Sequence, residues 1–233
     1  MPGARFQGLA GPVGAARLPA SNLLVMSDQD QHDAAPAPRA DAYRAPTDPP
    51  ADAVTPERHP EAPEPGAWLG SHYDQCFGCG EQRPEGLHLR TAAGPGVSVT
   101  AQFEVTEAHQ GAPGLIHGGL LAAAFDEVMG SVTWLLRVPA VTGRLETDFV
   151  KPVPVGRVVH LRAWCVGQSG RKFYHRAEAR LDGPEGQLVA RAAALFVAVK
   201  LEHFVTHGRS DEVQAVLEDP HRHRSMQAFE LNP

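Results

Sequence analysis

One long apolar stretch limits the possible folds of this chain more than any other feature. It begins in a Pro/Gly turn at Gly111 and continues as a helical pattern to about Leu136, and the only charges in the helix are Asp126 and Glu127. A helix that is apolar on all sides is normally buried. An acid in its middle must therefore be paired or have a chemical task. We expect the functional site along this stretch.

Strand-like runs, several of them with alternating apolar and polar residues, surround this helix and predict β-strands. Two of them, 87–90 and 97–104, precede it as a hairpin with one buried face. Four more follow, at about 142–151, 157–168, 171–182 and 187–199. Short turns between these runs indicate antiparallel neighbours. The pattern predicts an α+β domain, with one long helix packed on an antiparallel sheet, that leaves apolar surface for association.

Composition divides the chain into three parts. Residues 1–65 contain more than half of the prolines and almost no aromatic residues, which predicts a disordered N-terminal arm. Residues 66–201 form the predicted domain, and residues 202–233 a tail with one short helix from Ser210 to Leu217. Translation starts at Met1 or, alternatively, at Met26, directly before an acidic segment.

Charge and cysteine content exclude several classes of partner. A net charge of −6 provides no basic surface for nucleic acid. The best candidate for a membrane span, 112–136, is interrupted by His117, two glycines and the Asp126-Glu127 pair, so we expect no membrane segment. Three cysteines are too few for a disulfide framework and favour the reducing cytoplasm.

The segment Cys76-Phe77-Gly78-Cys79-Gly80 allows two interpretations. A C-x-x-C motif can be half of a zinc site, and His72 and His88 lie close enough in sequence to complete it. A structural zinc site normally has a second well-spaced pair, which this chain lacks. We therefore expect a glycine-rich turn with two reduced thiols, and no metal.

The start of the helix has the features of an oxyanion site. Gly118 and Gly119 fall in its first turn, where backbone N–H groups have no partners inside the helix. Glycine lets a ligand approach the backbone closely, and the helix dipole favours an oxygen that gains negative charge. Attack on a carbonyl, especially that of a thioester, has this requirement.

Asp126 lies seven residues after Gly119, which is a rise of about 10 Å along one helix. A reacting carbon must be near both the oxyanion donors and the nucleophile or base. One helix therefore does not supply both. Two subunits whose helices pack antiparallel about a twofold axis bring Asp126 of one toward the His117 turn of the other, which predicts a dimer with two shared sites.

Purely structural interpretations of the same residues remain open. His117 can be a helix-end histidine bonded to a carbonyl, and the two glycines after it can be a packing notch. Asp126 can be tied to a buried serine or to an arginine of a second subunit. Glu127 points about 100° away from Asp126, and we interpret it as an exposed or interface charge.

Four segments together resemble a known family. HQGAPGLIHGGLLAAAFDEVMG (109–130), the upstream CFGCG, and the downstream LETDFVKPVPVG and SGRKFYHRAEA are similar to the hotdog-fold acyl-CoA thioesterases of the phenylacetate-pathway and thioesterase-superfamily-member-4 type. The resemblance implies a long helix wrapped by an antiparallel sheet of five to six strands. It also implies a homodimer or homotetramer with sites at subunit interfaces, an acyl-CoA substrate and no cofactor.

The resemblance also assigns roles by position. Gly118, with the neighbouring Gly119 amide, would polarise the thioester carbonyl, and His117 would orient that carbonyl or the attacking water. Asp126 would be general base or nucleophile. The Ser/Thr of the strand after the helix falls on Thr142, which would hold the water.

One position departs from the family and others are less specific. Some members have an asparagine where this chain has Gly111, and Gln110 and His109 are the candidates to replace it. The basic residues predicted to contact coenzyme A phosphates are Lys151, Arg171 and Lys172, although each can equally be a surface charge. The residues predicted to line the acyl pocket are Phe125, Met129, Trp134 and Phe149, which are also ordinary core residues.

Three functional classes follow. The first is hydrolysis of an acyl-CoA thioester. The second is a hydratase or dehydratase of acyl thioesters, for which His117 and Asp126 would have to converge on the α and β carbons. The third is a non-enzymatic acyl-CoA sensor, but such regulators usually add a DNA-binding segment, and the acidic, proline-rich arm is unlike one.

Overall fold

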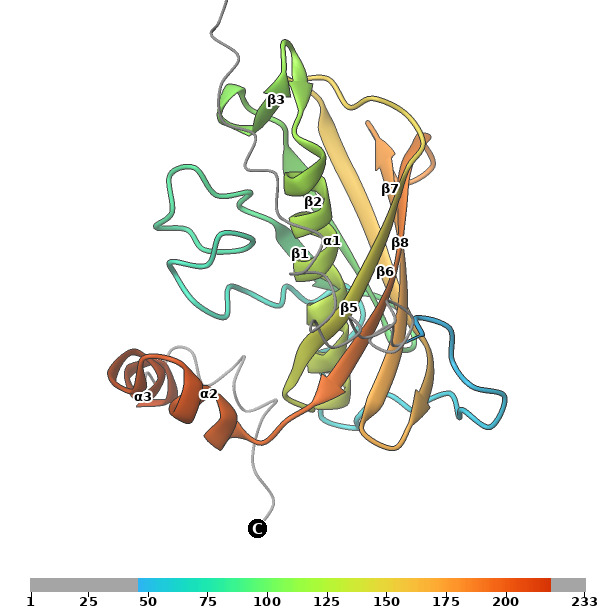
Figure 1. Ribbon diagram of the computed structural model, residues 1–233, viewed down its shortest axis with the longest axis vertical. Helices are drawn as coiled ribbons and strands as arrows, with labels where there is room; N and C mark the ends of the chain where they lie inside the picture. Colours follow the sequence, from blue (N-terminus) through green and yellow to red (C-terminus); the bar gives the residue numbers. More distant parts are fainter. Residues whose placement is uncertain (1–45, 219–233) are drawn as a thin grey trace, which may run out of the picture. The chain divides into compact units, whose positions relative to one another are not determined.

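The computed structural model describes residues 46–218. Its main element is a sheet of six antiparallel strands in the order β1-β2-β6-β7-β8-β5 (Figure 1). The strands are β1 (Arg90–Ala93), β2 (Ser98–Glu104), β5 (Ala140–Phe149), β6 (Val158–Ser169), β7 (Lys172–Leu181) and β8 (Gln187–Ala198). The predicted α+β arrangement is confirmed, and β5 lies at one edge of the sheet.

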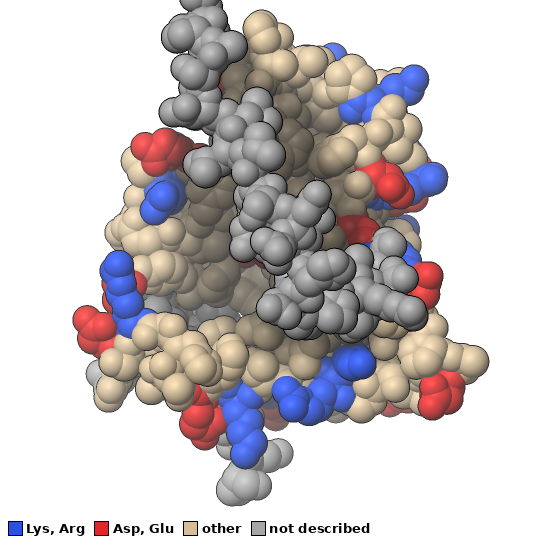
Figure 2. Space-filling model, viewed as in Figure 1, with Lys and Arg blue, Asp and Glu red and all other residues tan. Residues whose placement is uncertain are grey.

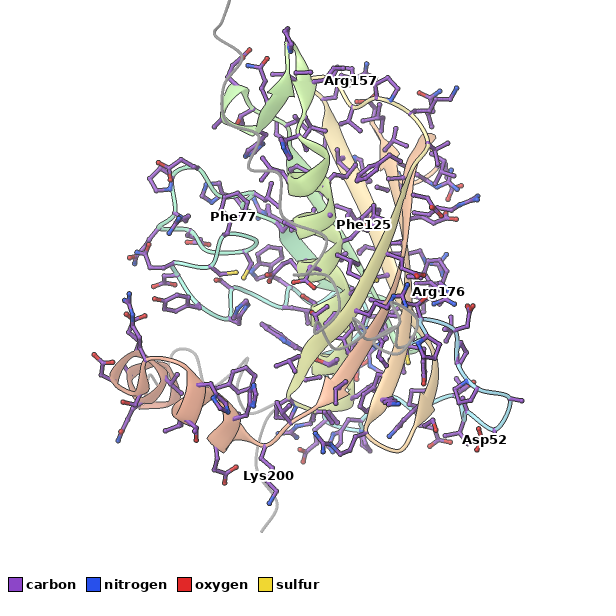
Figure 3. The ribbon with its side chains drawn as sticks, viewed as in Figure 1. Asp52, Phe77, Phe125, Arg157, Arg176 and Lys200 are labelled. Carbon is purple, nitrogen blue, oxygen red and sulfur yellow. The ribbon has the colours of Figure 1, made fainter. Side chains whose placement is uncertain are left out.

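The long apolar stretch forms α1 (Gly118–Val132), which continues as a 3-10 turn, η3 (Thr133–Leu136). Figure 1 shows α1 running along the sheet, and it contacts β2, β5, β6, β7 and β8. By length and composition this helix could span a membrane, with a mean hydropathy of 1.3. Its buried face, however, supplies the centre of the core, where Phe125 lies between α1 and the sheet (Figure 3).

The strand β7 shows how the alternating pattern fixes the core. Its inward residues Phe173, His175 and Ala177 are buried as predicted. The histidine Nδ1 lies 2.9 Å from the Met129 carbonyl oxygen of α1, and the ring stacks on Phe196 of β8. A polar side chain therefore links the helix to the sheet inside the core.

The first hairpin starts later than predicted. Strand β1 begins at Arg90, because the backbone N–H groups of Leu87 and Leu89 bond to the carbonyls of Phe77 and Gly78 instead of joining the sheet. Both leucines are still buried. The C-x-x-C segment therefore pairs with residues 87–89, which the alternating pattern had predicted to pair within the hairpin.

Short elements that the pattern did not predict complete the fold. They are a 3-10 turn η2 (Glu107–His109), a small hairpin of β3 (Gln110–Ala112) and β4 (Leu115–Ile116), and a helix α2 (Leu201–His207). The predicted tail helix is present as α3 (Ser210–Glu218). The tail therefore begins with a second helix rather than with coil.

The boundary of the predicted disordered arm is wrong in its last part. Residues 46–65 pack on the domain: Val54 bridges Gln168, Ala62 is buried in the core, and the Thr47 hydroxyl donates to Glu146 at 2.6 Å. The proline-rich composition did not reveal this packing, because such a segment contributes few apolar side chains and follows the sheet surface as coil. The rest of the predicted arm, 1–45, lies outside the described residues.

Candidate functional site

Asp126 and Thr142 meet at the edge of a cavity of about 590 Å³. The Thr142 hydroxyl, on β5, donates a hydrogen bond of 2.6 Å to Asp126 Oδ1, on α1. Thr142 is exposed and Asp126 half-buried, so the carboxylate is accessible from the cavity. The threonine predicted to hold a water is bonded directly to the predicted base, which leaves the second carboxylate oxygen for a reactant.

The turn at the start of α1 has the predicted form. His117 is the N-cap, and its Nδ1 accepts the Gly119 N–H at 2.9 Å. The N–H groups of Leu120 and Leu121 bond to the His117 carbonyl. Among the residues that the structure describes, no acceptor is found for the Gly118 N–H. Gly118 is therefore the amide available to an oxyanion, whereas the capping side chain occupies that of Gly119.

One chain keeps the two halves of the predicted site apart. Asp126 and Thr142 line the cavity described above, whereas Gly118 lines a separate hollow of about 360 Å³ together with Phe149 and Lys151. The separation agrees with the rise of about 10 Å expected along the helix. A reactant in one chain's cavity is thus not in contact with that chain's Gly118.

The departure from the family at Gly111 has a steric explanation. A Cβ on Gly111 would lie 2.6 Å from the His117 Cα, so this close approach of β3 to the cap requires glycine. His109 is buried, with Nδ1 accepting the Thr106 N–H and Nε2 3.3 Å from the Gly86 carbonyl. The Gln110 side chain accepts the Gly114 N–H at 2.6 Å. Both proposed replacements for the asparagine are engaged in local bonds.

The three predicted phosphate-binding residues are not brought together in one chain. Lys151 follows β5 and lines the hollow with Gly118. Arg171 and Lys172 lie at the turn between β6 and β7, where the Arg171 Nε donates to the Ala198 carbonyl at 2.9 Å. Ala198 pairs with the opposite end of β5. Lys151 and the Arg171-Lys172 pair therefore lie toward opposite ends of β5, and neither Arg171 nor Lys172 lines either hollow.

The predicted acyl-pocket residues Phe125 and Met129 are fully buried in the core and line neither hollow. The larger cavity is lined by Trp134, as predicted, and by residues that the sequence argument missed. These are the apolar Phe196, Leu201, Phe204 and Val213 and the polar His72, Tyr73 and Cys76. Leu201, Phe204 and Val213 come from α2 and α3, and the sequence pattern gave no sign that these helices lie near α1.

Glu127 is not the exposed charge that its helical position predicted. Only 14% of its side chain is exposed, and its Oε1 lies 3.3 Å from His72 Nδ1. Its Oε2 lies 3.3 Å from the Cys76 Sγ. The loop that carries Phe77 lies beside α1 in Figure 3, and Cys76 of this loop contacts the acid.

With Cys79, these residues form a group of four whose ligand atoms all lie within 4.8 Å of one another. The sequence contains no second well-spaced cysteine pair, but in the folded chain His72 and Glu127 supply the third and fourth ligand positions. His88, the other candidate histidine, is exposed and lies outside the group. Among the described residues, this group is the one able to hold a metal ion.

Contacts within this group shift the pKa values of three of its members, His72, Cys76 and Cys79. Burial alone would lower the pKa of His72, but hydrogen bonds and charge from Cys76 and Glu127 outweigh it and raise that pKa to about 10. A hydrogen bond from Cys79 lowers the pKa of Cys76 to about 3, and the same bond with burial raises the pKa of Cys79. This arrangement favours the thiolate form of Cys76 over that of Cys79.

Comparison with known proteins identifies the domain. Residues 113–186 match the family model of the thioesterase superfamily. This segment belongs to the thioesterase superfamily. The match includes α1, Asp126 and Thr142, and ends before β8. The six-stranded sheet with α1 packed on it is the hotdog fold of that superfamily, as the resemblance implied.

Relatives of this thioesterase domain include two curated proteins. The acyl-coenzyme A thioesterase THEM4 of Bos taurus is 33% identical over 93 residues, which are 40% of this chain and 38% of that protein. THEM4 of Xenopus laevis is 31% identical over 88 residues, 38% of this chain and 39% of that protein. The chain thus spans about two fifths of the length of the curated relatives it matches.

A solved structure of a thioesterase superfamily protein has the same fold. It superposes with a TM-score of 0.50 at 23% identity and covers 59% of this chain and 70% of that chain. At this identity the likeness concerns the fold of the thioesterase domain alone.

Proposed function

We propose that this protein hydrolyses the thioester of an acyl-coenzyme A to a free acid and CoA. The observation that carries the proposal is the Asp126 carboxylate, held by Thr142 at 2.6 Å and accessible from a cavity with largely apolar walls. A carboxylate in this setting can activate a water or attack a carbonyl itself. The names of the curated relatives, acyl-coenzyme A thioesterases, support the substrate class.

The proposed active unit is a homodimer, alone or as half of a tetramer, in which each site combines two chains. Asp126 and Gly118 line different hollows, so the N–H that stabilises the oxyanion would come from the partner subunit. Surface properties support association. The end of the edge strand β5 leaves Phe149 57% exposed and the next residue, Val150, 46% exposed.

The wall of the larger cavity supports a binding mode for the acyl group. Trp134, Phe196 and Phe204 line it beyond Asp126 and offer apolar contacts to a hydrocarbon or aromatic acyl chain. On the face shown in Figure 2, acidic and basic side chains lie mainly around the periphery, and the uncovered middle consists of other residues. Basic residues at the strand ends would then contact the CoA phosphates. We propose a cytoplasmic location, in keeping with the low cysteine content.

A CoA-release assay tests the activity. Purified protein is incubated with acyl-CoAs of increasing chain length and with an aromatic acyl-CoA, and free CoA is measured by chromatography. Asp126→Asn is expected to lower kcat at least 100-fold, whereas Asp148→Asn, which removes an exposed carboxylate on the same strand as Thr142, should retain activity. Full hydrolysis by a folded Asp126→Asn protein would exclude this role.

Other outcomes of the same assay identify the two competing functions. Consumption of an enoyl-CoA without release of CoA would show a hydratase. Binding of acyl-CoA without any turnover would show a sensor. For a hydrolase, single-turnover hydrolysis in ¹⁸O water tests direct attack by Asp126. Label in the Asp126 carboxylate arises only when the acid has displaced CoA to form an acyl anhydride that water then opens at the Asp126 carbonyl carbon.

A further inference from the structure

We infer that His72, Cys76, Cys79 and Glu127 form a tetrahedral zinc site that fastens the Cys76–Cys79 loop to α1. The two cysteines come from one tight turn and the histidine from the segment before it. The glutamate comes from the middle of the central helix. Two thiolates, an imidazole and a carboxylate are ligand types that Zn²⁺ accepts in proteins. Whether the protein binds zinc does not depend on the activity proposed above.

The distances between the four groups, all within 4.8 Å, are near those of ligands around one ion. Zinc bonds of about 2.0 to 2.3 Å place tetrahedral ligands about 3.3 to 3.8 Å apart. His72 Nδ1 lies 3.1 Å from the Cys79 Sγ and 3.3 Å from Glu127 Oε1. The Cys76 Sγ lies 3.3 Å from Glu127 Oε2. Small adjustments of side-chain torsions would centre an ion among them.

Hydrogen bonds alone satisfy this arrangement poorly. His72 Nδ1 carries at most one hydrogen, yet a sulfur and a carboxylate oxygen both lie within bonding distance of it. The Cys76 sulfur lies 3.3 Å from the Glu127 carboxylate in a half-buried setting, and without a metal only the weak S–H donor of a thiol can link them. A divalent cation satisfies all four groups at once, which neither a single proton nor a single imidazolium does.

Polar groups around the two sulfurs provide outer contacts of the kind that metal ligands have. The Gly78 N–H donates to the Cys76 Sγ at 3.3 Å, and the Ser71 hydroxyl lies 3.4 Å from the Cys79 Sγ. Such outer contacts orient a metal ligand and stabilise its negative charge. Four protein ligands leave no position for a substrate, so the ion would be structural rather than catalytic.

The backbone is shaped to let the glutamate reach this group. A Cβ on Gly78 would lie 2.5 Å from Glu127 Oε2, so the turn needs glycine where the acid enters. Cys76 and His72 also line the cavity that Asp126 borders. Zinc at this position would thus fix one wall of the cavity to the helix, one residue away from Asp126.

The metal content of the full-length protein tests the inference. Protein expressed in zinc-supplemented medium and purified without chelator is expected to contain about one zinc per chain by mass spectrometry of the metal. His72→Ala and Cys79→Ser should each reduce zinc content at least fivefold. The matched controls are His88→Asn and Cys165→Ser, a histidine and a cysteine outside the group, which should retain it.

A second measurement keeps the test valid if a ligand variant fails to fold. Wild-type protein stripped by chelator is titrated with Zn²⁺ and, separately, with Co²⁺. A 1:1 end point for zinc, with thiolate-to-cobalt charge-transfer absorption and tetrahedral d–d bands, is the expected result. A zinc content near zero with a Cys76–Cys79 disulfide by mass, or the absence of both metal end points in folded protein, would overturn the assignment.

Discussion

The Thr142 hydroxyl on the edge strand donates a hydrogen bond of 2.6 Å to the Asp126 carboxylate on the central helix. These residues are separated by 16 positions in the sequence and belong to different elements. The bond fixes one carboxylate oxygen and leaves the other for water or for the thioester carbon. It also ties the reactive group to β5, whose outer edge would meet a second subunit.

Replacing Thr142 by valine should lower kcat roughly 10- to 100-fold, because a hydrogen bond to a charged group is worth about 1.5 to 3 kcal/mol. The effect should appear mainly in kcat, since the threonine orients the acid rather than the substrate. Steady-state kinetics with the best acyl-CoA measure it. Thr142→Ser retains the hydroxyl and should recover most of the activity. Equal losses in the serine and valine variants would contradict the assigned role.

The free N–H of Gly118 can be removed without breaking the helix. Proline is tolerated at the first helical position, and the preceding residue, His117, already has the extended conformation that proline requires. We expect Gly118→Pro to lower kcat about 100-fold or more, as loss of an oxyanion donor does elsewhere. Gly118→Ala adds a Cβ near Phe149 but keeps the N–H, and should be much more active. If both variants lose activity equally, crowding rather than the lost donor is responsible.

Mixing inactive subunits tests whether the sites are shared. Asp126→Asn and Gly118→Pro proteins are each inactive as homodimers under the proposal. In a hybrid dimer, one site carries both defects and the other carries neither, so random reassortment at equal concentration should restore about a quarter of wild-type activity. If each site lay within one chain, both sites of the hybrid would be defective and activity would stay at the level of the parents. Exchange of subunits is verified by native mass spectrometry.

The central helix and the sheet were predictable because their periodicity is strong. The apolar stretch after His117 and the alternation in β6 and β7 each extend over ten or more residues, which fixes the element type and the buried face. The roles of Asp126 and Thr142 followed from the family resemblance and stay predictions. Their direct hydrogen bond was not foreseen, since it depends on the side-chain geometry between helix and strand.

The cluster at Glu127 was beyond the sequence argument for a different reason. The helical wheel places this residue away from Asp126 and thus on a face that would be exposed if nothing covered it. The covering segment is a loop with tight turns and no periodicity, and its path over α1 is fixed by contacts between distant residues such as Leu89 and Gly78. Likewise, residues 46–65 lack an apolar pattern and yet follow the sheet. The periodicity of apolar residues does not predict where a coil segment packs against the core.

The close packing of β3 on the helix cap predicts sensitivity at Gly111. A methyl group there would lie 2.6 Å from the His117 Cα, so Gly111→Ala forces the hairpin away from the cap. We expect a loss of about 1 to 3 kcal/mol in the free energy of unfolding, typical of overpacking, measured by urea denaturation. Ala112→Ser, at the next and exposed position, is the control and should change stability by less than about 0.5 kcal/mol. A fully stable Gly111→Ala protein would show that the cap does not depend on this contact.

The buried His175 should make the fold less stable in mild acid. Burial lowers its pKa to about 3, although its hydrogen bond to the Met129 carbonyl acts in the opposite direction. Among the described residues its Nε2 has no partner, so a protonated ring would place an uncompensated charge in the core. Between pH 6.5 and 3 the unfolded chain binds the proton and the folded chain does not, so stability is complete above pH 6.5 and decreases as the pH falls.

The expected contribution of this histidine approaches about 1.4 kcal/mol per pH unit within that range. Urea denaturation at several pH values from 7 to 5 measures it as the difference in slope between wild type and His175→Phe, which keeps a ring beside Phe196 but cannot titrate. The exposed His88→Asn is the control and should leave the wild-type slope unchanged. Identical slopes for wild type and His175→Phe would mean that the ring is protonated as readily in the folded chain as in the unfolded one, and thus that water reaches Nε2.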